Sequence, residues 1–439
     1  MEYDKRFIEE SFPVKEVSIE SAREKNIRHG HISTLHIWWA RRPLASSRAT
    51  NYAALIPAPK DEIERNNKKK FIIDLCKWES SLDSNIINKA REDILKANNG
   101  VPPKVLDPFA GGGAIPLEAL RLGCEVYASD YNPVAVLIEK CTLEYPQKYG
   151  KLVKKSSENS NNLFDSENEF INPLVEDIKK WGNWVLEETK KEIGKFYSPD
   201  EDGKVPVGYI WARTIPCQNP NCGITIPLMR QFWLCKKSNR KISLYPYIEN
   251  KEVKFKIVGT GYEEMPGSFN PEKGTVSRAI VNCPVCGSMI DANTTRKLFQ
   301  EGKSGQKMIA VVLTKKGTQG KIYRIATEND IEIFFQAEKY LEEKREKLRE
   351  EWGIDPVPNE LIDAKSVKPR TMYLYGMKTW GDLFNSRQKL ALITFVEKVK
   401  QIYKKIIGQE YDEEYAKTIV NYLALGIDRL VTYLVTLTR

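Results

Sequence analysis

Two short apolar runs early in the second hundred residues flank a glycine turn and a segment of helical periodicity. Residues 104–107 (KVLD) form the first run, and residues 126–129 (VYAS) form the second, which Asp130 follows. Three glycines and the segment 114–122, with apolar residues three to four apart, lie between them. Short apolar runs bounded by glycine predict buried strands, whereas helical spacing predicts a helix. The pattern predicts a strand, a tight turn, a helix and a second strand, as in an α/β fold.

Five segments differ in their pattern of apolar and polar positions. They are a helical N-terminal segment, the first part of the α/β core, a linker with a helical insert, a cysteine-bearing domain of short strand-like runs and a helical C-terminal region: residues 1–60, 100–150, 151–205, 206–330 and 331–439. Within the linker, the Ser/Asn-rich tract 156–170 is typical of a surface connection. The charged run 338–352 (EKYLEEKREKLREEW) predicts a solvated helix face.

The helical insert has a recognisable start. Asn172 is expected as the cap and Pro173 in the first turn, where proline needs no hydrogen-bonded N–H. Leu174, Ile178, Trp181 and Val185 follow at helical spacing. We therefore expect a helix that buries one apolar face.

Composition places the chain among soluble globular proteins. Of its 439 residues, 41% are hydrophobic and 29% are charged, and 68 Lys and Arg against 59 Asp and Glu give a net charge of +9. This excess suits a polyanionic partner without requiring one. No stretch approaches the ~18 uninterrupted apolar residues of a membrane span, and the N-terminus lacks the apolar core of a signal peptide. We expect a cytoplasmic protein without membrane contact.

The glycine turn has features that suit a nucleoside cofactor. Glycine lets backbone N–H groups at a helix N-terminus approach a ligand without a side-chain clash. An acid at the end of the next strand, here Asp130, accepts hydrogen bonds from ribose hydroxyls. The alternative is a purely structural strand–helix turn, but Asp107, the glycines and Asp130 occur in the order that cofactor binding requires. The spacing differs from the GxGxxG of dinucleotide enzymes.

Four of the eight cysteines form two close pairs, Cys217 with Cys222 and Cys283 with Cys286. In a reducing cytosol such pairs indicate a metal more than disulfides. Four thiolates from two Pro- and Gly-containing turns suit tetrahedral Zn²⁺ in a structural site. Four unligated thiols are the alternative, and the CPxCG pattern favours zinc. The other cysteines are expected to be packing residues: Cys76, Cys124, Cys141 and Cys235.

The N-terminal segment concentrates histidine, tryptophan and arginine in residues 28–49. All three histidines lie within eight residues, and a metal site made from them is the less favoured interpretation. Trp38 and Trp39 beside Arg41 and Arg42 place stacking faces next to cations, which suits a nucleoside or a phosphate backbone. A buried Trp pair with a surface Arg pair explains the composition at least as well.

Longer motifs resemble the adenine-specific DNA methylases that carry a zinc ribbon and open with a conserved domain of unknown function. The motifs are LHIWWARRPLASSRA (35–49), VLDPFAGGGAIPLEALRLG (105–123), SDYNPVAV (129–136), LEYPQKYG (143–150), YIWARTIPCQNPNCG (209–223), NCPVCG (282–287) and TWGDLFNSRQKLAL (379–392). The resemblance extends over essentially the whole chain and is more specific than any single motif. Some relatives occur in bacterial defence or restriction–modification systems.

The resemblance implies a Rossmann-like S-adenosylmethionine-dependent methyltransferase core with an inserted zinc ribbon and additional helices, and it implies DNA as the partner. DPFAGGG resembles the cofactor motif of amino-methyltransferases, so Asp107 and the glycine turn are expected near the methionine part of S-adenosylmethionine. Asp130 is expected at the ribose and residues 131–133 beside the adenine. The expected cofactor-binding residues are Asp107, Pro108, Phe109, Ala110, Gly111, Gly113, Asp130, Tyr131, Asn132 and Pro133.

The catalytic tetrapeptide of that family has no counterpart in this sequence. In such enzymes Asn, Asp or Ser, followed by Pro-Pro and an aromatic residue, orients the target amino group and stacks on the extruded base. The one Pro-Pro pair here, Pro102–Pro103, precedes the first strand and is followed by Lys104. The catalytic residues are therefore unknown. We expect a truncated, split or degenerate member that needs a downstream segment or a second polypeptide.

Two other functions compete with that of the cofactor-binding part of a DNA adenine methyltransferase. The run LDPFAGGG followed by IPLEAL also resembles RNA guanine methyltransferases, although no RNA-binding domain precedes the glycine motif here. A zinc-ribbon scaffold that binds nucleic acid and keeps a vestigial cofactor pocket is the non-enzymatic alternative. The missing tetrapeptide favours the scaffold, and the intact glycine motif opposes it.

Overall fold

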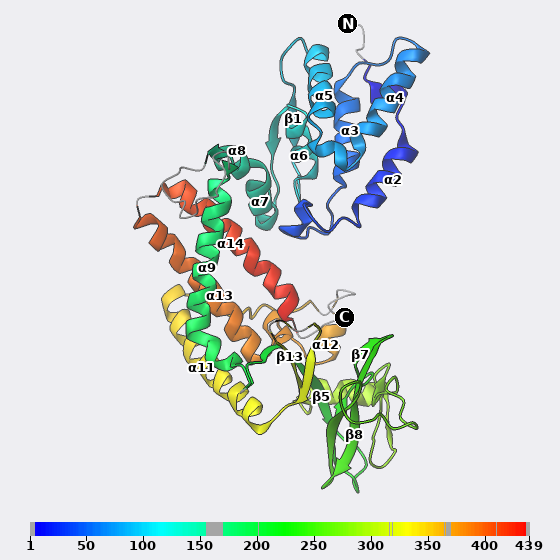
Figure 1. Cartoon of the computed structure of the whole chain (residues 1–439), viewed down its shortest axis with the longest axis vertical. Coiled ribbons are helices and arrows are strands. Elements are labelled where there is room, and N and C mark those ends of the chain that lie inside the picture. Colours follow the sequence, from blue (N-terminus) through cyan, green and yellow to red (C-terminus); the bar gives the residue numbers. More distant parts are fainter. Residues whose placement is uncertain are drawn as a thin grey trace. The chain divides into compact units, whose positions relative to one another are not determined.

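The computed structural model describes residues 5–154, 170–200, 202–315, 317, 319–363, 365, 370–409 and 411–435. The chain divides into two compact units, the first unit and the second unit. The first comprises Met1–Val185 and Lys398–Thr432, and the second comprises Leu186–Glu397 and Tyr433–Arg439. Figure 1 follows the chain from the N-terminal helices in blue to the C-terminal helix in red.

The first unit opens with helices that enclose an apolar core. They are α1 (Phe7–Glu10), α2 (Val14–Glu24), the 3₁₀ turn η1 (Ile32–Thr34), α3 (Leu44–Leu55), α4 (Glu62–Cys76), the 3₁₀ turn η2 (Glu79–Leu82) and α5 (Ser84–Ala97). Tyr52 on α3, Leu75 on α4 and Ile94 on α5 are almost completely buried in one cluster. Helical structure thus extends beyond residues 1–60, because α4 and α5 supply part of the core that α3 needs.

The predicted strand, turn, helix and second strand are confirmed. β1 (Lys104–Asp107) and β2 (Glu125–Ala128) are parallel neighbours, and α6 (Ala114–Arg121) connects them. Parallel strands need such a crossover connection. Val105 and Val126, opposite each other in register, pack against the core of the N-terminal helices. In Figure 1, α3, α5 and α6 lie beside this short sheet.

The opposite side of the β1–β2 sheet is open. Leu106 is 69% exposed and Tyr127 is 49% exposed, and each alternates with a valine that faces the core. Parallel sheets are normally covered on both faces. Across the described part of the chain β1 and β2 form a sheet of two strands. Together with α6, this sheet forms one β-α-β unit, as is expected in a Rossmann-like core. Among the described residues, no further strand joins the sheet.

Most of the rest of the first unit is helical, and some of its helices continue into the second unit. The elements are α7 (Pro133–Glu139), the π-helical turn η3 (Lys140–Glu144), α8 (Tyr145–Tyr149), α9 (Pro173–Ile193), α13 (Ser386–Ile407) and α14 (Glu413–Leu434). The Asn421 amide donates to the Tyr145 hydroxyl at 2.8 Å, and the Tyr422 hydroxyl donates to the Cys141 carbonyl at 2.6 Å. These bonds attach α14 to the helices that follow β2.

Helix α9 begins at Pro173 as predicted. The Asn172 side chain accepts a hydrogen bond from the Val175 N–H at 3.4 Å, as expected of a cap. Three of the four predicted apolar positions, Leu174, Trp181 and Val185, are buried, and Ile178 is partly buried. Before α9, the short strands β3 (Val153–Lys154) and β4 (Phe170–Ile171) pair antiparallel. The predicted surface tract at 156–170 falls, except for its last residue, outside the described residues.

The second unit is built mainly from antiparallel sheets. One sheet has the order β14–β13–β5–β6, the second β7–β8–β9 and the third β10–β11–β12. The strands are β5 (Val205–Pro216), β6 (Thr225–Leu228), β7 (Trp233–Lys237), β8 (Arg240–Glu249), β9 (Glu252–Gly259), β10 (Val276–Ser277), β11 (Ile280–Asn282), β12 (Met289–Ile290), β13 (Gly305–Thr314) and β14 (Ile322–Ile325). Helical elements follow or separate them: η5 (Gly194–Tyr197), α10 (Ala292–Gln300), α11 (Glu328–Trp352), α12 (Arg370–Leu374) and η6 (Trp380–Leu383).

The charged run at 338–352 lies on α11, but the prediction of a purely solvated face is wrong. Lys344 is only 6% exposed, and its ammonium group contacts the carboxylates of Glu192 and Glu397. A buried cation needs such partners because it has lost its hydration. None of the described helices combines the length with the apolar character needed to span a bilayer.

Candidate functional site

The glycine turn between β1 and α6 is closed by the acid at the end of β2. Gly111 and Gly113 have φ of +55° and +71°, a left-handed backbone that favours glycine. The Asp130 carboxylate accepts hydrogen bonds from the Gly111 N–H at 2.9 Å and from the Asn132 N–H at 2.8 Å. The Asp107 carboxylate accepts one from the Phe109 N–H at 3.2 Å. The two predicted acids thus lie on either side of the turn.

A pocket of about 430 Å³ opens at this turn. Its walls combine β1, the turn, Asp130 and the N-terminal segment: Trp38, Ala40, Arg41, Arg42, Asp107, Phe109, Ala110, Gly111, Gly112, Ala114, Ile115 and Asp130. Five of the ten predicted cofactor residues line it: Asp107, Phe109, Ala110, Gly111 and Asp130. Gly112 lines it as well, although the sequence motif did not predict a contact there.

The other predicted residues lie around the pocket without lining it. Gly113 is the buried N-cap of α6, and Pro108 precedes the turn. Tyr131 is 97% exposed. The Asn132 side chain accepts a hydrogen bond from the Val134 N–H and caps α7, whose first residue is Pro133. Residues 131–133 therefore shape the start of α7 at the rim of the pocket.

The N-terminal segment packs directly on the glycine turn. A Cβ atom added to Gly111 would lie 2.7 Å from the indole nitrogen of Trp38. A Cβ atom added to Gly112 would lie 2.7 Å from Nε of Arg41. Both separations are far below van der Waals contact, so these positions tolerate no side chain in this arrangement. Glycine is required here for close approach by Trp38 and Arg41.

Arg41 brings a charge with unused hydrogen-bonding capacity into the pocket. Its Nη2 donates to the His36 carbonyl at 3.1 Å, while its Nε and Nη1 are buried and have no protein acceptor among the described residues. Burial lowers the pKa of Arg41 to about 10. The interpretation of a buried Trp pair with a surface Arg pair is wrong, because Trp39 is 80% exposed and Arg41 lines the pocket. Trp38 and Trp39 stack with ring centroids 4.6 Å apart.

Two of the three histidines, which precede Trp38 in the sequence, anchor the N-terminal segment. His31 Nε2 lies 2.8 Å from the Glu24 carboxylate, and His36 contacts Asp428 on α14. Arg429 donates to the Thr34 carbonyl at 2.6 Å. The less favoured histidine metal site finds no support, because the four cysteines are the one group of possible ligands that the described residues bring within reach of a common ion.

Glu139 is an acidic neighbour of the turn that the sequence did not single out. It lies on α7, is only 6% exposed, and its Oε1 has no described partner. Burial, followed by the negative charges of Asp130 and Asp107, raises the pKa of Glu139 to about 7. A Cβ atom on Gly113 would lie 3.7 Å from its side chain. Glu139 belongs to no sequence motif, so the sequence alone could not predict that it lies next to the turn.

The four predicted cysteines converge in the second unit. Cys217 and Cys222 follow β5, and Cys283 and Cys286 lie between β11 and β12. Sulfur–sulfur distances are 3.7 Å for Cys217–Cys286 and 3.8 Å for Cys222–Cys283, and all four sulfurs lie within 4.8 Å of one another. Zinc–sulfur bonds of about 2.3 Å in a tetrahedron place sulfurs roughly 3.8 Å apart. The quartet therefore could hold a metal ion.

Comparison with known families assigns two parts of the chain. Residues 11–76 match the family described as a protein of unknown function (DUF1156). Residues 92–197 match the D12 class N6 adenine-specific DNA methyltransferase family, and this match includes β1, the glycine turn and Asp130. No curated protein and no solved structure matches the chain. The match at residues 92–197 indicates a methyltransferase domain of the D12 adenine-specific class, and a domain of this kind indicates an S-adenosylmethionine-dependent methyltransferase.

Proposed function

We propose that the first unit binds S-adenosylmethionine at the glycine turn and serves as the cofactor-binding part of a DNA adenine amino-methyltransferase. The observation that carries this proposal is the Arg41 guanidinium beside Gly112, with buried Nε and Nη1, in one pocket with the carboxylates of Asp107 and Asp130. A pocket of about 430 Å³ has the size of an ordinary small-ligand site.

The charges in the pocket fit the chemistry of this cofactor. S-adenosylmethionine carries one carboxylate, one ammonium group and a positive sulfonium. The carboxylate suits the free Nε and Nη1 donors of Arg41, since a guanidinium binds carboxylates through paired N–H groups. Asp107, which lines the pocket, suits the positive groups. Asp130 is placed to accept the ribose hydroxyls with the carboxylate capacity that the Gly111 and Asn132 N–H groups leave available.

Bound at this site, the cofactor would supply an electrophilic methyl group, and the chain would orient it and shield it from water. Trp38 and Arg41 cover the turn, so they reduce solvent access on that side. Adenine's amino group must also be oriented, which requires the tetrapeptide that the sequence lacks. We assign this task to a further segment or second polypeptide, and the open β1–β2 sheet with exposed Leu106 and Tyr127 offers it an apolar face.

DNA is favoured over RNA as the substrate, because the matched family is adenine-specific for DNA. The methyltransferase domain also argues against the non-enzymatic scaffold. A cytoplasmic location remains our expectation. For the cysteine quartet we propose one structural Zn²⁺, because four thiolates fill every position of a tetrahedral ion and leave none for a substrate. This ion would link the turn that follows β5 to the turn that follows β11 and would thereby stabilise the second unit.

Calorimetric titration with S-adenosylhomocysteine, the demethylated product, tests the cofactor proposal. The folded chain should bind it with one site per chain. A folded protein that produces no binding heat with either cofactor form would overturn the assignment. Labelled methyl transfer to DNA and to tRNA, with the complementing segment present, separates the DNA from the RNA enzyme.

A further inference from the structure

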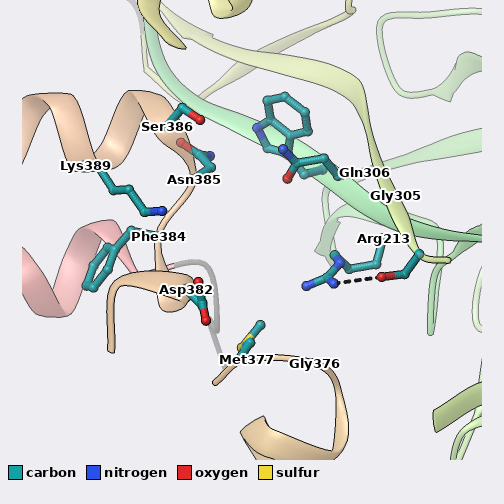
Figure 2. A pocket seen from close by; sticks show the side chains of 12 residues that line it. Arg213, Gly305, Gln306, Gly376, Met377, Asp382, Phe384, Asn385, Ser386 and Lys389 are labelled. Carbon is teal, nitrogen blue, oxygen red and sulfur yellow. Dashed lines mark hydrogen bonds between the residues drawn. The ribbon is translucent and has the colours of Figure 1, made fainter. Parts of the chain in front are cut away.

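A second pocket, of about 460 Å³, lies within the second unit. It opens between β5, the start of β13 and the segment that leads into α13 (Figure 2). None of the predicted cofactor or metal residues lines it. Part of its wall, residues 379–389, belongs to the motif TWGDLFNSRQKLAL, to which neither the methyltransferase domain nor the cysteine quartet gives a role.

Two cations approach this pocket from opposite walls. Arg213 comes from β5 and Lys389 from the first turns of α13, and in Figure 2 both side chains point into the same space. The Arg213 Nη2 donates to the Ser304 hydroxyl at 3.3 Å, and its guanidinium carbon lies 4.9 Å from the centroid of the Phe299 ring. These contacts hold the guanidinium while its other nitrogens remain available to a ligand.

The acid in the pocket, Asp382, is already engaged by the backbone. Its carboxylate accepts hydrogen bonds from the Lys378 N–H at 2.9 Å and the Thr379 N–H at 2.8 Å and caps the short helix η6. Although burial opposes ionisation, these bonds lower the pKa of Asp382. The single negative charge of Asp382 does not neutralise the two positive charges of Arg213 and Lys389. The pocket therefore favours an anion.

The walls also offer flat and hydrogen-bonding surfaces. Trp211 supplies an aromatic ring, and Gln306 and Asn385 supply amide groups. The Phe384 ring is turned away from the pocket and packs against an apolar cluster (Figure 2). The Asn385 side chain accepts from the Gln388 N–H at 3.0 Å, which places it at the beginning of α13. The positive end of that helix adds to the attraction for a negative group. A phosphate attached to a planar heterocycle meets both features, whereas a simple inorganic anion uses only the cations.

We propose that this pocket binds a nucleotide of DNA, with the phosphate between Arg213 and Lys389 and the base beside Trp211. Arginine and lysine together neutralise a phosphodiester, and aromatic side chains stack on bases of any sequence. This inference rests on the proposed function, which makes DNA the substrate. It assigns the second unit a contact with nucleic acid separate from the cofactor pocket.

The test is fluorescence anisotropy with a labelled single-stranded oligodeoxynucleotide and its duplex at several salt concentrations. Lys389→Gln should weaken DNA binding about tenfold at low salt, because one charge-assisted contact is lost. It should also reduce the dependence of log affinity on log salt by about one phosphate contact. Lys404→Gln, an exposed position on the same helix, is the matched control and should bind like the wild type.

Further arms separate the possible outcomes. Arg213→Gln should weaken DNA binding as Lys389→Gln does. Because Arg213 also packs on Phe299, the melting temperature of the Arg213→Gln variant must be measured as well. Deoxyadenosine monophosphate should displace the oligonucleotide at concentrations where inorganic phosphate does not. Unchanged affinity and salt slope in folded Lys389→Gln would overturn the proposal, as would equal displacement by inorganic phosphate. Failure of the wild type to bind S-adenosylhomocysteine would instead count against the proposed function, because cofactor binding does not involve this pocket.

Discussion

Arg48 and Glu118 form an ion pair in which neither side chain has any exposed surface. The Arg48 guanidinium donates to the two carboxylate oxygens at 2.6 and 3.3 Å, and its third nitrogen donates to the carbonyls of Leu75 and Lys77. Arg48 lies on α3, and Glu118 lies on α6, which follows the glycine turn. The segment of unknown function and the methyltransferase segment thus share one core.

Breaking this pair should destabilise the first unit strongly. Glu118→Leu leaves the buried Arg48 guanidinium without its carboxylate, and Arg48→Met leaves the buried Glu118 with Arg121 as its remaining cation. We expect a loss of about 3–5 kcal/mol in the free energy of unfolding, with the larger loss for Glu118→Leu. The double replacement should cost less than the two single losses combined. Urea unfolding of all three variants checks this. Lys179→Met, which breaks an exposed pair with Glu176, should cost below about 1 kcal/mol; an equal cost for both pairs would contradict the expectation.

Arg41 should distinguish ligands by their carboxylate. Arg41→Gln is expected to weaken S-adenosylhomocysteine by about 1.5–3 kcal/mol, since hydrogen bonds to a charged group are lost. Binding of 5′-methylthioadenosine, which has the nucleoside but no carboxylate, should stay the same. Calorimetry with both ligands measures the difference. Arg42→Gln is the control, because Arg42 lines the same pocket but is exposed. A similar loss for both ligands would show that Arg41 supports the fold and does not bind the carboxylate.

The glycine turn and its strands could be predicted because their determinants are local. Gly111 and Gly113 need positive φ, and Asp130 follows β2 directly, so the chain order alone places the acid near the turn. The metal quartet was predictable for the same reason, since each pair of cysteines forms its own short turn. The pairing of the two turns needed only one further assumption, a common ion.

Contacts between distant segments were not predictable in this way. From the sequence, Arg41 is indistinguishable from an ordinary surface arginine. The residues next to it in the sequence do not indicate that it packs on Gly112. Lys344 belongs to a run of charges, and its burial depends on Glu192 and Glu397 from elsewhere in the chain. Such positions depend on tertiary packing, which periodicity along one segment does not encode.

Removing one cysteine of the quartet should release the metal. Cys283→Ser should lower the zinc content from one ion per chain to none and lower the melting temperature of the second unit, since binding energy of a structural ion is folding energy. Elemental analysis and thermal unfolding measure both effects. Cys235→Ser is the control, because this thiol lies outside the quartet. Chelator-free protein that contains no zinc would contradict the assignment.

Glu139 should make the stability of the first unit depend on pH near neutrality. Its pKa is about 7 in the folded protein, whereas the ordinary pKa of a glutamate carboxyl, which applies to the unfolded chain, is 4.5. The native state therefore binds more protons between these values, and the wild type loses stability as the pH rises through this window. The charged groups that oppose its ionisation are Asp130 and Asp107.

Glu139→Gln removes the titrating group, so its melting temperature should gain on that of the wild type as the pH increases from about 5 to 8. Differential scanning fluorimetry across this range measures the effect. Glu144→Gln is a suitable control, because hydrogen bonding to Lys148 lowers the pKa of Glu144 and moves its titration below the window. Parallel curves for wild type and Glu139→Gln would show that the carboxyl is ionised in the folded state.

Methyl transfer should require more than cofactor binding. The amino group of adenine is a weak nucleophile because its lone pair is delocalised into the ring. Acceptors that orient its protons and an aromatic side chain that holds the flipped base supply the positioning and the electrostatic stabilisation on which such catalysis depends. Asn132 precedes a single proline, but its side chain is occupied in capping α7. We therefore expect the isolated chain, saturated with S-adenosylmethionine, to transfer no methyl group to DNA.

A polypeptide that carries the tetrapeptide on a strand should restore activity by pairing beside β1. Ligands of parallel α/β sheets bind at the carboxyl ends of the strands, so a strand next to β1 would bring its tetrapeptide to the glycine turn. The rest of the added polypeptide should pack on the open face of the sheet, so that the exposed side chains of Leu106 and Tyr127 become protected from solvent. Transfer of labelled methyl to unmethylated genomic DNA, with and without the added polypeptide, is the measurement. Robust transfer by the chain alone that Asp107→Ala abolishes would show that the described residues already contain the catalytic groups.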